Sequence, residues 1–326
     1  DAASDEQIDF FPQKFFRGLA DTIDHQVNLI SDADPHMLES VNPAKMMRRE
    51  KAVKAWRDMR TQKENAGQFT WTLALYGTAG LAKEAGLSEE EFWQQIIDAC
   101  FLEEADPIAK WREVSGEIKA YIDKLNALPI EKLHVEGEDV DLWVKLGEKR
   151  QWAGGSGRNI PSFEIFTSPD WRGTEGWIRF NVPLYRYGNL VEGIRLEFKD
   201  GKVAAATATK NEAVITKMIA TENADKVGEF SLTDSRHSRI TKFMANTLYD
   251  ENIGGPFGNT HIAVGMSYHD CYAGDMTSVN KEEWARLGFN DSSVHTDMFS
   301  TTDRTVTATL TDGSTKVIYK DGQFQV

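Results

Sequence analysis

The chain has 326 residues, of which 40% are hydrophobic and nine are tryptophan, so it is long and apolar enough for roughly two domains with sizeable cores. That composition excludes an intrinsically disordered protein. The formal net charge of −14 argues against a general nucleic-acid-binding protein and against a protein that binds anionic membranes.

The expected cellular setting follows from the apolar runs and the cysteines. No apolar run approaches the roughly 20 residues that are needed to span a bilayer. No signal peptide is visible, although the chain starts at Asp1 and not at Met, which leaves a removed leader open. Cys100 and Cys271 are the only cysteines, and two free thiols suit a reducing compartment better than one disulfide bond does. We therefore expect a cytoplasmic protein with no membrane partner.

Residues 1–130 are predicted to form a helix-rich α/β part of the protein. Alternation of apolar and polar residues predicts short strands over 26–30 and 70–75. Between these strands, a charged segment predicts a long helix over about 42–62.

N-terminal capping residues predict two further helices. Ser88 and Glu91 form a capping box at the beginning of one helix. Asp106 and Pro107 fit the N-cap and first position of the next. In that helix, apolar residues recur every three or four positions over 111–125, a stripe that indicates packing against a core.

Strand patterns predominate after residue 130. The Gly-rich segment 151–158 lacks the Gly-Lys-Ser/Thr ending of a phosphate-binding loop, so we expect an ordinary loop there. The predicted elements are strands over 139–146, 177–187 and 190–206, helices over 212–222 and 238–249, and a final pair of strands joined at 311–314. The sequence thus predicts an α/β (α+β) fold with a helix-rich domain over 1–130 and a β-rich domain over 131–326.

His295-Thr296-Asp297 is the first candidate for chemistry. Residues two apart in a strand lie on the same face, so the His295 imidazole and the Asp297 carboxylate would project side by side. Such a pair is a common beginning of a metal site, although the motif alone is a weak signal.

Further candidate ligands lie upstream. Glu164 and Glu229 are flanked by apolar residues, His261 begins an apolar strand, and Glu251 lies at a predicted helix end that disfavours negative charge. A charge among apolar residues is costly to bury unless it is paired or coordinated. The alternative is structural: a glutamate on a half-exposed strand points to water, and a lone histidine, or Tyr268, often belongs to the core or a pocket rim.

Together these side chains favour a metal site over separate structural roles. Imidazole and carboxylate ligands suit Zn, Co or Mn better than Ca. Three or four carboxylates with two histidines suffice for two ions roughly 3.5–4 Å apart, with one carboxylate bridging them. Such a pair lowers the pKa of a bound water and polarises a carbonyl oxygen, which predicts a two-metal hydrolase with an open choice of substrate.

Five short motifs, in this order, resemble the aminopeptidase T and PepS family of metallopeptidases. They are Glu164-x-Phe166-Thr167-x-Pro169, Gly228-Glu229, Leu248-Tyr249-Asp250-Glu251-Asn252, His261-x-Ala263-x-Gly265-x-x-Tyr268 and Asn290-x-Ser292-x-x-His295-x-Asp297-Met298. Each is short, but five in the family order and at nearly the family spacing make a specific signal.

The resemblance implies an exopeptidase that releases N-terminal residues from peptides with two divalent ions. The implied metal ligands are Glu164, Glu229, Glu251, His261, His295 and Asp297. Glu229 would bridge the ions, Glu164, His261 and Asp297 would hold one of them, and Glu251 with His295 the other. Tyr268 and Glu229 are the implied catalytic residues, with the Tyr268 phenol donating a hydrogen bond to the oxyanion of the reaction.

The resemblance also implies a fold and an assembly. Family members are homodimers with an α/β N-terminal domain, a β-rich, barrel-like catalytic domain and sites that face an internal cavity. The chain departs from the family in two places: its N-terminal part is shorter, and the linker over 253–260 is longer. The longer linker bears most on Glu251, although its Gly and Pro content allows it to bulge outward.

Two other functions stay open. The shortened N-terminal part and the longer linker are compatible with a non-catalytic peptide-binding or assembly protein that retains the fold. A metallohydrolase of phosphoesters is disfavoured, because His269-Asp270 is the one segment near the usual ligand pattern of that class. His237 and His269 match no ligand position of the family and are expected to be structural or to lie at the pocket rim.

Overall fold

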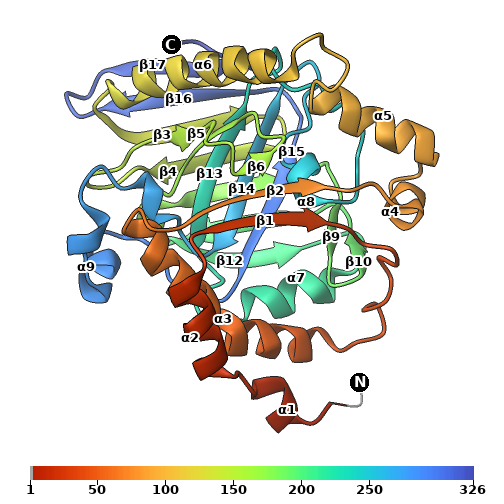
Figure 1. Ribbon diagram of the computed structural model, residues 1–326. Coiled ribbons are helices and arrows are strands. Elements are labelled where there is room, and N and C mark those ends of the chain that lie inside the picture. Colours follow the sequence, from red (N-terminus) through yellow and green to blue (C-terminus); the bar gives the residue numbers. More distant parts are fainter. Residues whose placement is uncertain (1–2) are drawn as a thin grey trace.

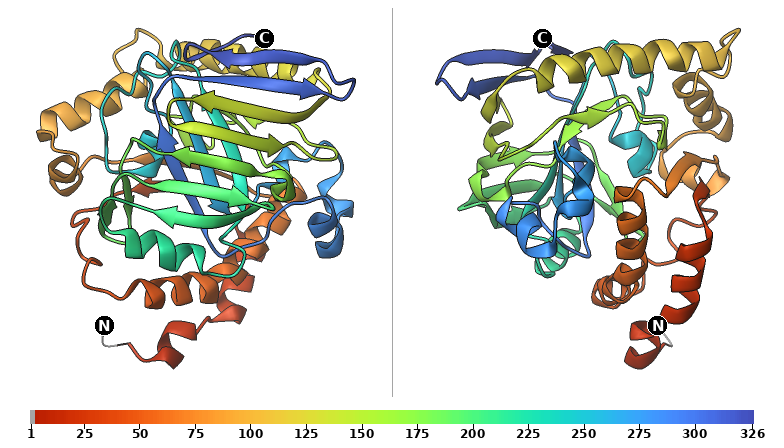
Figure 2. Two further views of the ribbon diagram at one scale, coloured as in Figure 1. Left: turned by 180° about the vertical axis from the view of Figure 1, so that it is seen from behind. Right: turned by 60° about the vertical axis from the view of Figure 1, so that its left-hand side comes forward.

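Three layers make up the molecule. The computed structural model describes residues 3–326. An eight-stranded sheet forms one side, a five-stranded sheet lies against it, and the N-terminal helices with a small three-stranded sheet cover the other face of the five-stranded sheet (Figure 1). Seen from behind, the strands of the two large sheets cross at a steep angle (Figure 2).

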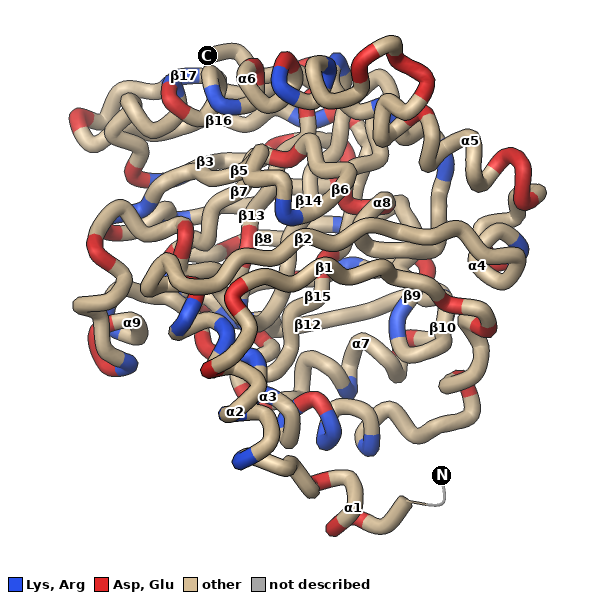
Figure 3. Tube along the Cα trace, viewed as in Figure 1, with Lys and Arg blue, Asp and Glu red and all other residues tan. Residues whose placement is uncertain are grey.

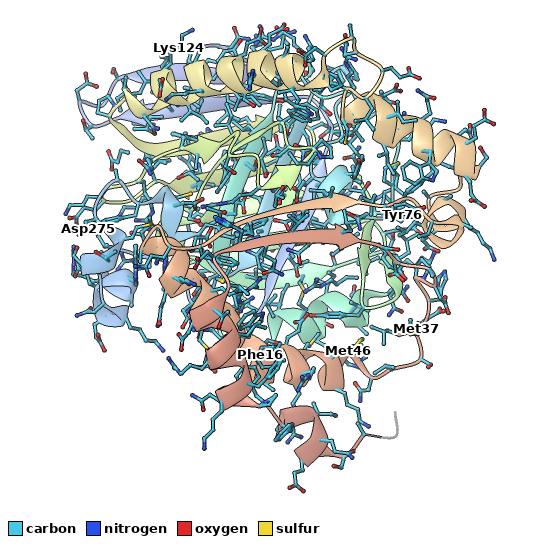
Figure 4. All side chains as sticks on the ribbon, in the orientation of Figure 1. Phe16, Met37, Met46, Tyr76, Lys124 and Asp275 are labelled. Carbon is cyan, nitrogen blue, oxygen red and sulfur yellow. The ribbon has the colours of Figure 1, made fainter. Side chains whose placement is uncertain are left out.

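The N-terminal layer follows the predicted order of elements. In chain order it contains α1 (Asp5–Asp9), α2 (Gln13–Thr22), β1 (His25–Ile30), α3 (Pro43–Asn65), β2 (Thr70–Leu75), α4 (Ala79–Glu84), α5 (Glu89–Ala99) and α6 (Pro107–Asn126). The predicted capping box is present: Ser88 Oγ accepts from the Glu91 N–H at 3.1 Å, and Glu91 Oε2 accepts from the Ser88 N–H at 2.9 Å. Phe16 of α2, labelled in Figure 4, packs on Trp56 of α3 with ring centroids 5.1 Å apart.

The remaining elements are mainly strands. They are β3 (Ile130–Gly137), β4 (Val140–Lys145), β5 (Ala153–Gly154), β6 (Asn159–Ile160), β7 (Glu164–Thr167), η1 (Trp171–Gly173), β8 (Glu175–Arg179), β9 (Leu184–Arg186), β10 (Asn189–Val191), β11 (Arg195–Lys199), β12 (Lys202–Thr207), α7 (Glu212–Ile219), β13 (Val227–Thr233), α8 (Thr247–Asp250), β14 (Asn259–Gly265), η2 (His269–Cys271), η3 (Met276–Ser278), α9 (Lys281–Arg286), β15 (His295–Ser300), β16 (Arg304–Leu310), β17 (Thr315–Lys320) and β18 (Gln323–Phe324). The large sheet has the order β12-β11-β8-β4-β3-β16-β17-β18, and the site-bearing sheet the order β15-β14-β13-β7-β5. The expected barrel-like part thus consists of two stacked sheets, each with its own edge strands.

The predicted helix over 238–249 is wrong for most of its length. Only Thr247–Asp250 is helical. Ala245 has a φ of 52°, which interrupts a right-handed helix. The Asp250 carboxylate accepts a hydrogen bond from the Met244 N–H at 2.7 Å, so the preceding segment is held as a loop folded back on the short helix.

One hydrophobic core connects the layers. Buried side chains of α5 and α6 belong to the same cluster as those of both large sheets. The short strand β6 even pairs with β2 of the N-terminal sheet. The division into domains 1–130 and 131–326 stays a prediction, since core and strand pairing run across it. Within residues 3–326, no helix is long and apolar enough to cross a membrane.

Candidate metal centre

One row of residues crosses three adjacent strands of the five-stranded sheet. Glu229 of β13 lies opposite Ala263 of β14, which lies opposite Asp297 of β15. Directly opposed residues in a sheet point to the same face. The small Ala263 side chain in the middle of the row leaves room for the two carboxylates to lean toward each other.

Three more polar residues share this face. His261 of β14 and His295 of β15 each lie two residues before a member of the row, and side chains two apart lie on one face. Glu164 begins β7, the strand on the other side of β13. The strand geometry expected of His295 and Asp297 is therefore confirmed, and Glu164 and Glu229 are buried, not turned to water.

A glycine explains how β13 presents its glutamate. The pairing of β13 with β14 shifts register between Val227 and Glu229, which marks a bulge at Gly228. A Cβ at Gly228 would lie 2.2 Å from the Met266 carbonyl oxygen and 2.6 Å from that of Gly265. Since real Cβ atoms do not approach backbone oxygens so closely, only glycine fits, and the bulge sets the direction of the following side chain.

The acidic and imidazole side chains form two groups that share Glu229. In the first group, His261 Nε2 lies 3.3 Å from Glu164 Oε2 and 3.4 Å from Glu229 Oε1. In the second group, His295 Nε2 lies 3.4 Å from Glu229 Oε2 and 3.3 Å from Asp297 Oδ1. Two ligands of a tetrahedral ion at about 2.1 Å are separated by about 3.4 Å, so both groups have the spacing that a small divalent ion requires.

The pairing of His295 with Asp297 differs from the division that the family resemblance implies. That division assigns the two side chains to different ions, whereas the structure places them in one group. Asp297 Oδ1 also lies 4.0 Å from His261 Nε2. Because a carboxylate has two oxygens, Asp297 is within reach of both groups.

Two hydrogen bonds that orient proposed ligands were not predicted from the sequence. His295 Nδ1 donates to the Met266 carbonyl oxygen at 2.8 Å, which leaves Nε2 as the ligand atom of the ring. Ser231 Oγ donates to Glu164 Oε2 at 3.2 Å and orients that carboxylate. Ser231 lies two residues after Glu229, so strand alternation was a signal for it. A backbone carbonyl such as that of Met266 carries no signal in the sequence.

Among the described residues, the buried carboxylates of the site have histidine neighbours but no Lys or Arg partner. Glu164, Glu229, Glu251 and Asp297 are all buried, and within residues 3–326 none of them forms an ion pair with Lys or Arg. Burial and the neighbouring Glu229 raise the pKa of Glu164 to about 7. Buried carboxylates that lie close together are stable when a cation neutralises them. The donor set of this site therefore fits divalent ions.

Glu251 lies at the C-terminal end of α8, as predicted, and faces the same cavity as the two groups. Its Oε1 accepts hydrogen bonds from Asn159 Nδ2 at 3.3 Å and from Asn252 Nδ2 at 3.4 Å. Burial and the charge of Glu164 raise its pKa well above the usual value. Glu251 is a member of neither three-residue group, although it is an electrostatic neighbour of both.

The linker over 253–260, which the family resemblance leads us to expect to be longer than usual, bulges outward. Residues 255–257 are exposed, and the Tyr319 hydroxyl donates to the Phe257 carbonyl oxygen at 3.1 Å, which fixes the bulge against β17. Both ends of the linker remain buried. The linker therefore reaches the outer surface without exposing either Glu251 or His261.

Tyr268 lies beside the second group. Its ring centroid is 4.7 Å from that of His295 and 5.9 Å from that of Phe166. The Tyr268 backbone N–H donates to Ser168 Oγ at 2.8 Å, which anchors the loop after β14. Burial and the charge of Glu229 raise the Tyr268 pKa well above its usual value, so the phenol keeps its proton and can donate a hydrogen bond.

A cavity of about 1950 Å³ separates this face of the sheet from the N-terminal layer. Its lining includes side chains of α3 and α6 on one side and Glu164, Glu229, Tyr268, His295 and Asp297 on the other. Ordinary small-molecule sites occupy roughly 300–1,000 Å³. The cavity can therefore hold a peptide of several residues against the two groups.

The other histidines of this region lie outside both groups. The His269 ring stacks on Trp284 at a centroid distance of 3.9 Å and lines the cavity, and burial lowers its pKa to about 4. Asp270 is paired with Arg158 at 2.8 Å. The segment closest to a phosphoesterase pattern thus contributes to the wall of the cavity, and His237 belongs to neither group.

Loss of one imidazole tests the second group. We expect His295→Ala to lower metal affinity by more than the roughly 10–100-fold that loss of a supporting partner costs, because it removes a proposed ligand itself. Metal content after dialysis, measured by inductively coupled plasma mass spectrometry, checks this result. His25→Ala, an exposed histidine on β1, is the control and should retain wild-type metal content. Equal metal content in both variants would contradict the assignment.

Known metalloproteases and aminopeptidases are similar to this chain over most of its length. A family model described as thermophilic metalloprotease (M29) matches residues 1–324. Aminopeptidase T of Thermus aquaticus is 32% identical over 318 residues, which cover 91% of this chain and 76% of the relative. Aminopeptidase AmpS of Bacillus subtilis is 27% identical over 340 residues, which cover 98% of this chain and 82% of the relative.

A solved structure is similar to this chain over its whole length. Wild-type AmpT from Thermus thermophilus superimposes with a TM-score of 0.83 and 28% identity over 100% of this chain and 83% of that one. The expected α/β class, with helices first and sheets after them, is confirmed. The resemblance to the aminopeptidase T and PepS family is likewise confirmed, and the chain belongs to the M29 family of metalloproteases.

Proposed function

We propose that the protein is a metal-dependent aminopeptidase that releases N-terminal amino acids from peptides by hydrolysis. Membership of the M29 family and the aminopeptidase names of its relatives support this reaction class. The observation that carries the proposal is the pair of ligand groups that share Glu229 at the wall of a peptide-sized cavity.

Each ligand group is proposed to hold one divalent ion. Glu229 would contribute one oxygen to each ion, and Glu251 is the proposed additional ligand of the ion at His295. The mixture of imidazole and carboxylate donors favours Zn, Co or Mn. When bound, two such ions activate a water and polarise the peptide carbonyl.

Side chains of the protein are proposed to stabilise the developing negative charge and to transfer the proton. The Tyr268 phenol is proposed to donate a hydrogen bond to the oxygen that gains negative charge as the peptide carbonyl is attacked. A carboxylate of the ligand groups is the candidate for carrying the proton to the leaving amine. The Met266 carbonyl and Ser231 hold the ligands that they contact in one orientation.

The decisive experiment combines metal analysis with peptide turnover. We expect two divalent ions per chain and hydrolysis of amino-acid p-nitroanilides with added cobalt, zinc or manganese. Absence of metal uptake and of hydrolysis with all three ions would refute the proposal. Peptide binding without cleavage by the metal-loaded protein would instead support the alternative, a non-catalytic peptide-binding or assembly protein.

Metal affinity is expected to rise with pH. In the metal-free protein burial lowers the histidine pKa values, but hydrogen bonding of His261 to Glu229 and the charge of Asp297 near His295 outweigh it. The pKa values rise to about 9 for His261 and about 10 for His295. At pH 7 both rings therefore hold a proton that a metal ion must displace.

Competition with a chromophoric chelator at pH 6.5, 7.5 and 8.5 measures this effect. Each displaced proton should strengthen apparent binding by about tenfold per pH unit below the histidine pKa values. The gain should level off once the pH exceeds those values, because the rings are then already neutral. A flat affinity over this range would contradict the protonated state of the two rings.

Assembly and location are further proposals. We propose a homodimer, in line with the family resemblance, and light scattering after size-exclusion chromatography tests it. We also propose a cytoplasmic location, because Cys100 and Cys271 are both free and buried. Fractionation of the native host with an antibody to the protein tests that location.

A further inference from the structure

Two arginines of α3, Arg57 and Arg60, line the cavity that the ligand groups face. They are three positions apart and are therefore neighbours on one side of the helix. Figure 3 shows charges of both signs along α3, although the whole chain has a net charge of −14. The two guanidinium groups thus concentrate positive charge across the cavity from a strongly acidic site.

Neither guanidinium group is neutralised by an ion pair within residues 3–326. The carboxylates that act on them electrostatically are Asp291 and Glu64. Asp291 already lies 2.8 Å from Lys54 Nζ, and Glu64 lies 2.8 Å from Arg158. Other lining cations such as Lys54 and Arg158 are therefore paired, whereas the two α3 arginines are not.

Each of the two groups also has a donor without a protein acceptor. Arg57 Nη2 donates to the Ser292 carbonyl oxygen at 2.8 Å, and Arg60 Nη1 donates to Gln26 Oε1 at 3.2 Å. The Nε atom of both arginines is buried and has no protein acceptor. Because the Nε atoms are buried, a ligand in the cavity would meet these groups through their Nη atoms. Like charges at this helical spacing repel each other, and a bound anion would reduce that repulsion.

We propose that Arg57, supported by Arg60, binds the C-terminal carboxylate of a short peptide whose N-terminal residue lies at the two ligand groups. The inference rests on the proposed aminopeptidase activity and adds recognition of the other end of the substrate. A carboxylate matches the fork of N–H donors on a guanidinium and can accept two hydrogen bonds from it.

The anchor of Arg57 limits how far its guanidinium can lie from the second ligand group. Ser292, whose carbonyl accepts from Arg57, precedes His295 of the second group by three residues. Three residues span at most about 11 Å when fully extended, and an extended tripeptide covers about the same distance. This short chain separation limits the distance between the Arg57 anchor and His295, so we propose a di- or tripeptide as the ligand that spans it.

The test compares trialanine with trialanine amide on the metal-loaded enzyme. We expect the wild-type KM to be lower for trialanine by roughly 10- to 100-fold, the scale of a charge-assisted hydrogen bond. Arg57→Gln should remove this preference by raising KM for trialanine alone. Arg57→Lys keeps the charge without the fork and should give an intermediate ratio. Arg112→Gln, an exposed arginine of the same cavity, is the control and should leave the ratio unchanged.

An equal change of KM for both peptides in Arg57→Gln would overturn the inference, since it would show that Arg57 only docks α3 on the loop at Ser292. Failure of the proposed function is a separate result, because it abolishes cleavage of p-nitroanilides, which have no C-terminal carboxylate. In that case, calorimetric titration of the metal-loaded protein with the same two peptides tests whether the protein recognises the C-terminal carboxylate. Equal affinity for acid and amide would overturn the carboxylate site.

Discussion

Glu229→Ala is expected to abolish aminopeptidase activity and to lower the metal content of the protein. Glu229 is the one residue that both ligand groups share, and its two oxygens lie 3.4 Å from different imidazoles. Its loss therefore weakens both proposed ion sites at once. We expect activity on p-nitroanilides to fall by more than about 10³-fold, the upper scale for loss of a single oxyanion donor.

A matched variant separates this effect from a general change of charge. Glu222 also lines the cavity, but its side chain is 74% exposed and is paired with Lys51 at 3.4 Å. Glu222→Ala should retain activity and metal content. Circular dichroism should show that both variants are folded. A Glu229→Ala protein with wild-type metal content and activity would refute the shared-ligand assignment.

Local patterns in the sequence predicted most of the fold. The strand over 70–75 was predicted with the bounds that β2 has, and the capping box at Ser88 is present, because both depend on neighbouring residues alone. The predicted helix over 238–249 was wrong for most of its length, because only Thr247–Asp250 is helical. The left-handed conformation at Ala245 and the hydrogen bonds to the Asp250 carboxylate override helix propensity there.

The candidate site was predictable as a set of residues and not as a geometry. Strand alternation places His295 beside Asp297. The apolar neighbours of Glu164 and Glu229 were compatible with burial or with a water-facing strand position, and the structure shows that both are buried. The row that joins β13, β14 and β15 depends on a strand register that a sequence does not reveal. The bulge at Gly228 shifts that register and decides which carboxylate meets which imidazole.

The part of α3 that lines the cavity could not be predicted from the sequence, for a different reason. Arg57 and Arg60 lie in a charged helix, where such residues ordinarily face water. Their exposure to the cavity depends on how α3 packs against the loop that precedes β15, a contact between residues 235 positions apart. A motif search finds residues that are close in sequence, whereas this cavity joins two distant parts of the chain.

Tyr268→Phe is expected to retain metal and fold but to lower kcat by ~10²–10³-fold, the usual scale for one oxyanion donor. The ring packs against His295 and Phe166, and phenylalanine preserves those contacts. Burial and the charge of Glu229 raise the Tyr268 pKa well above its usual value, which favours the protonated phenol as a donor. Its removal therefore affects the step in which charge develops, so kcat should fall while KM changes little.

The control for this variant is Tyr272→Phe, a nearby tyrosine whose hydroxyl lies 3.5 Å from Lys149 Nζ and away from the ligand groups. It should leave kcat unchanged, and both variants should bind metal as the wild type does. If Tyr268→Phe instead lost metal, the hydroxyl would act on the ions or their ligands and not on the substrate. If it retained full kcat, the oxyanion would be stabilised without the phenol, and the charge would have to be met by the ions alone.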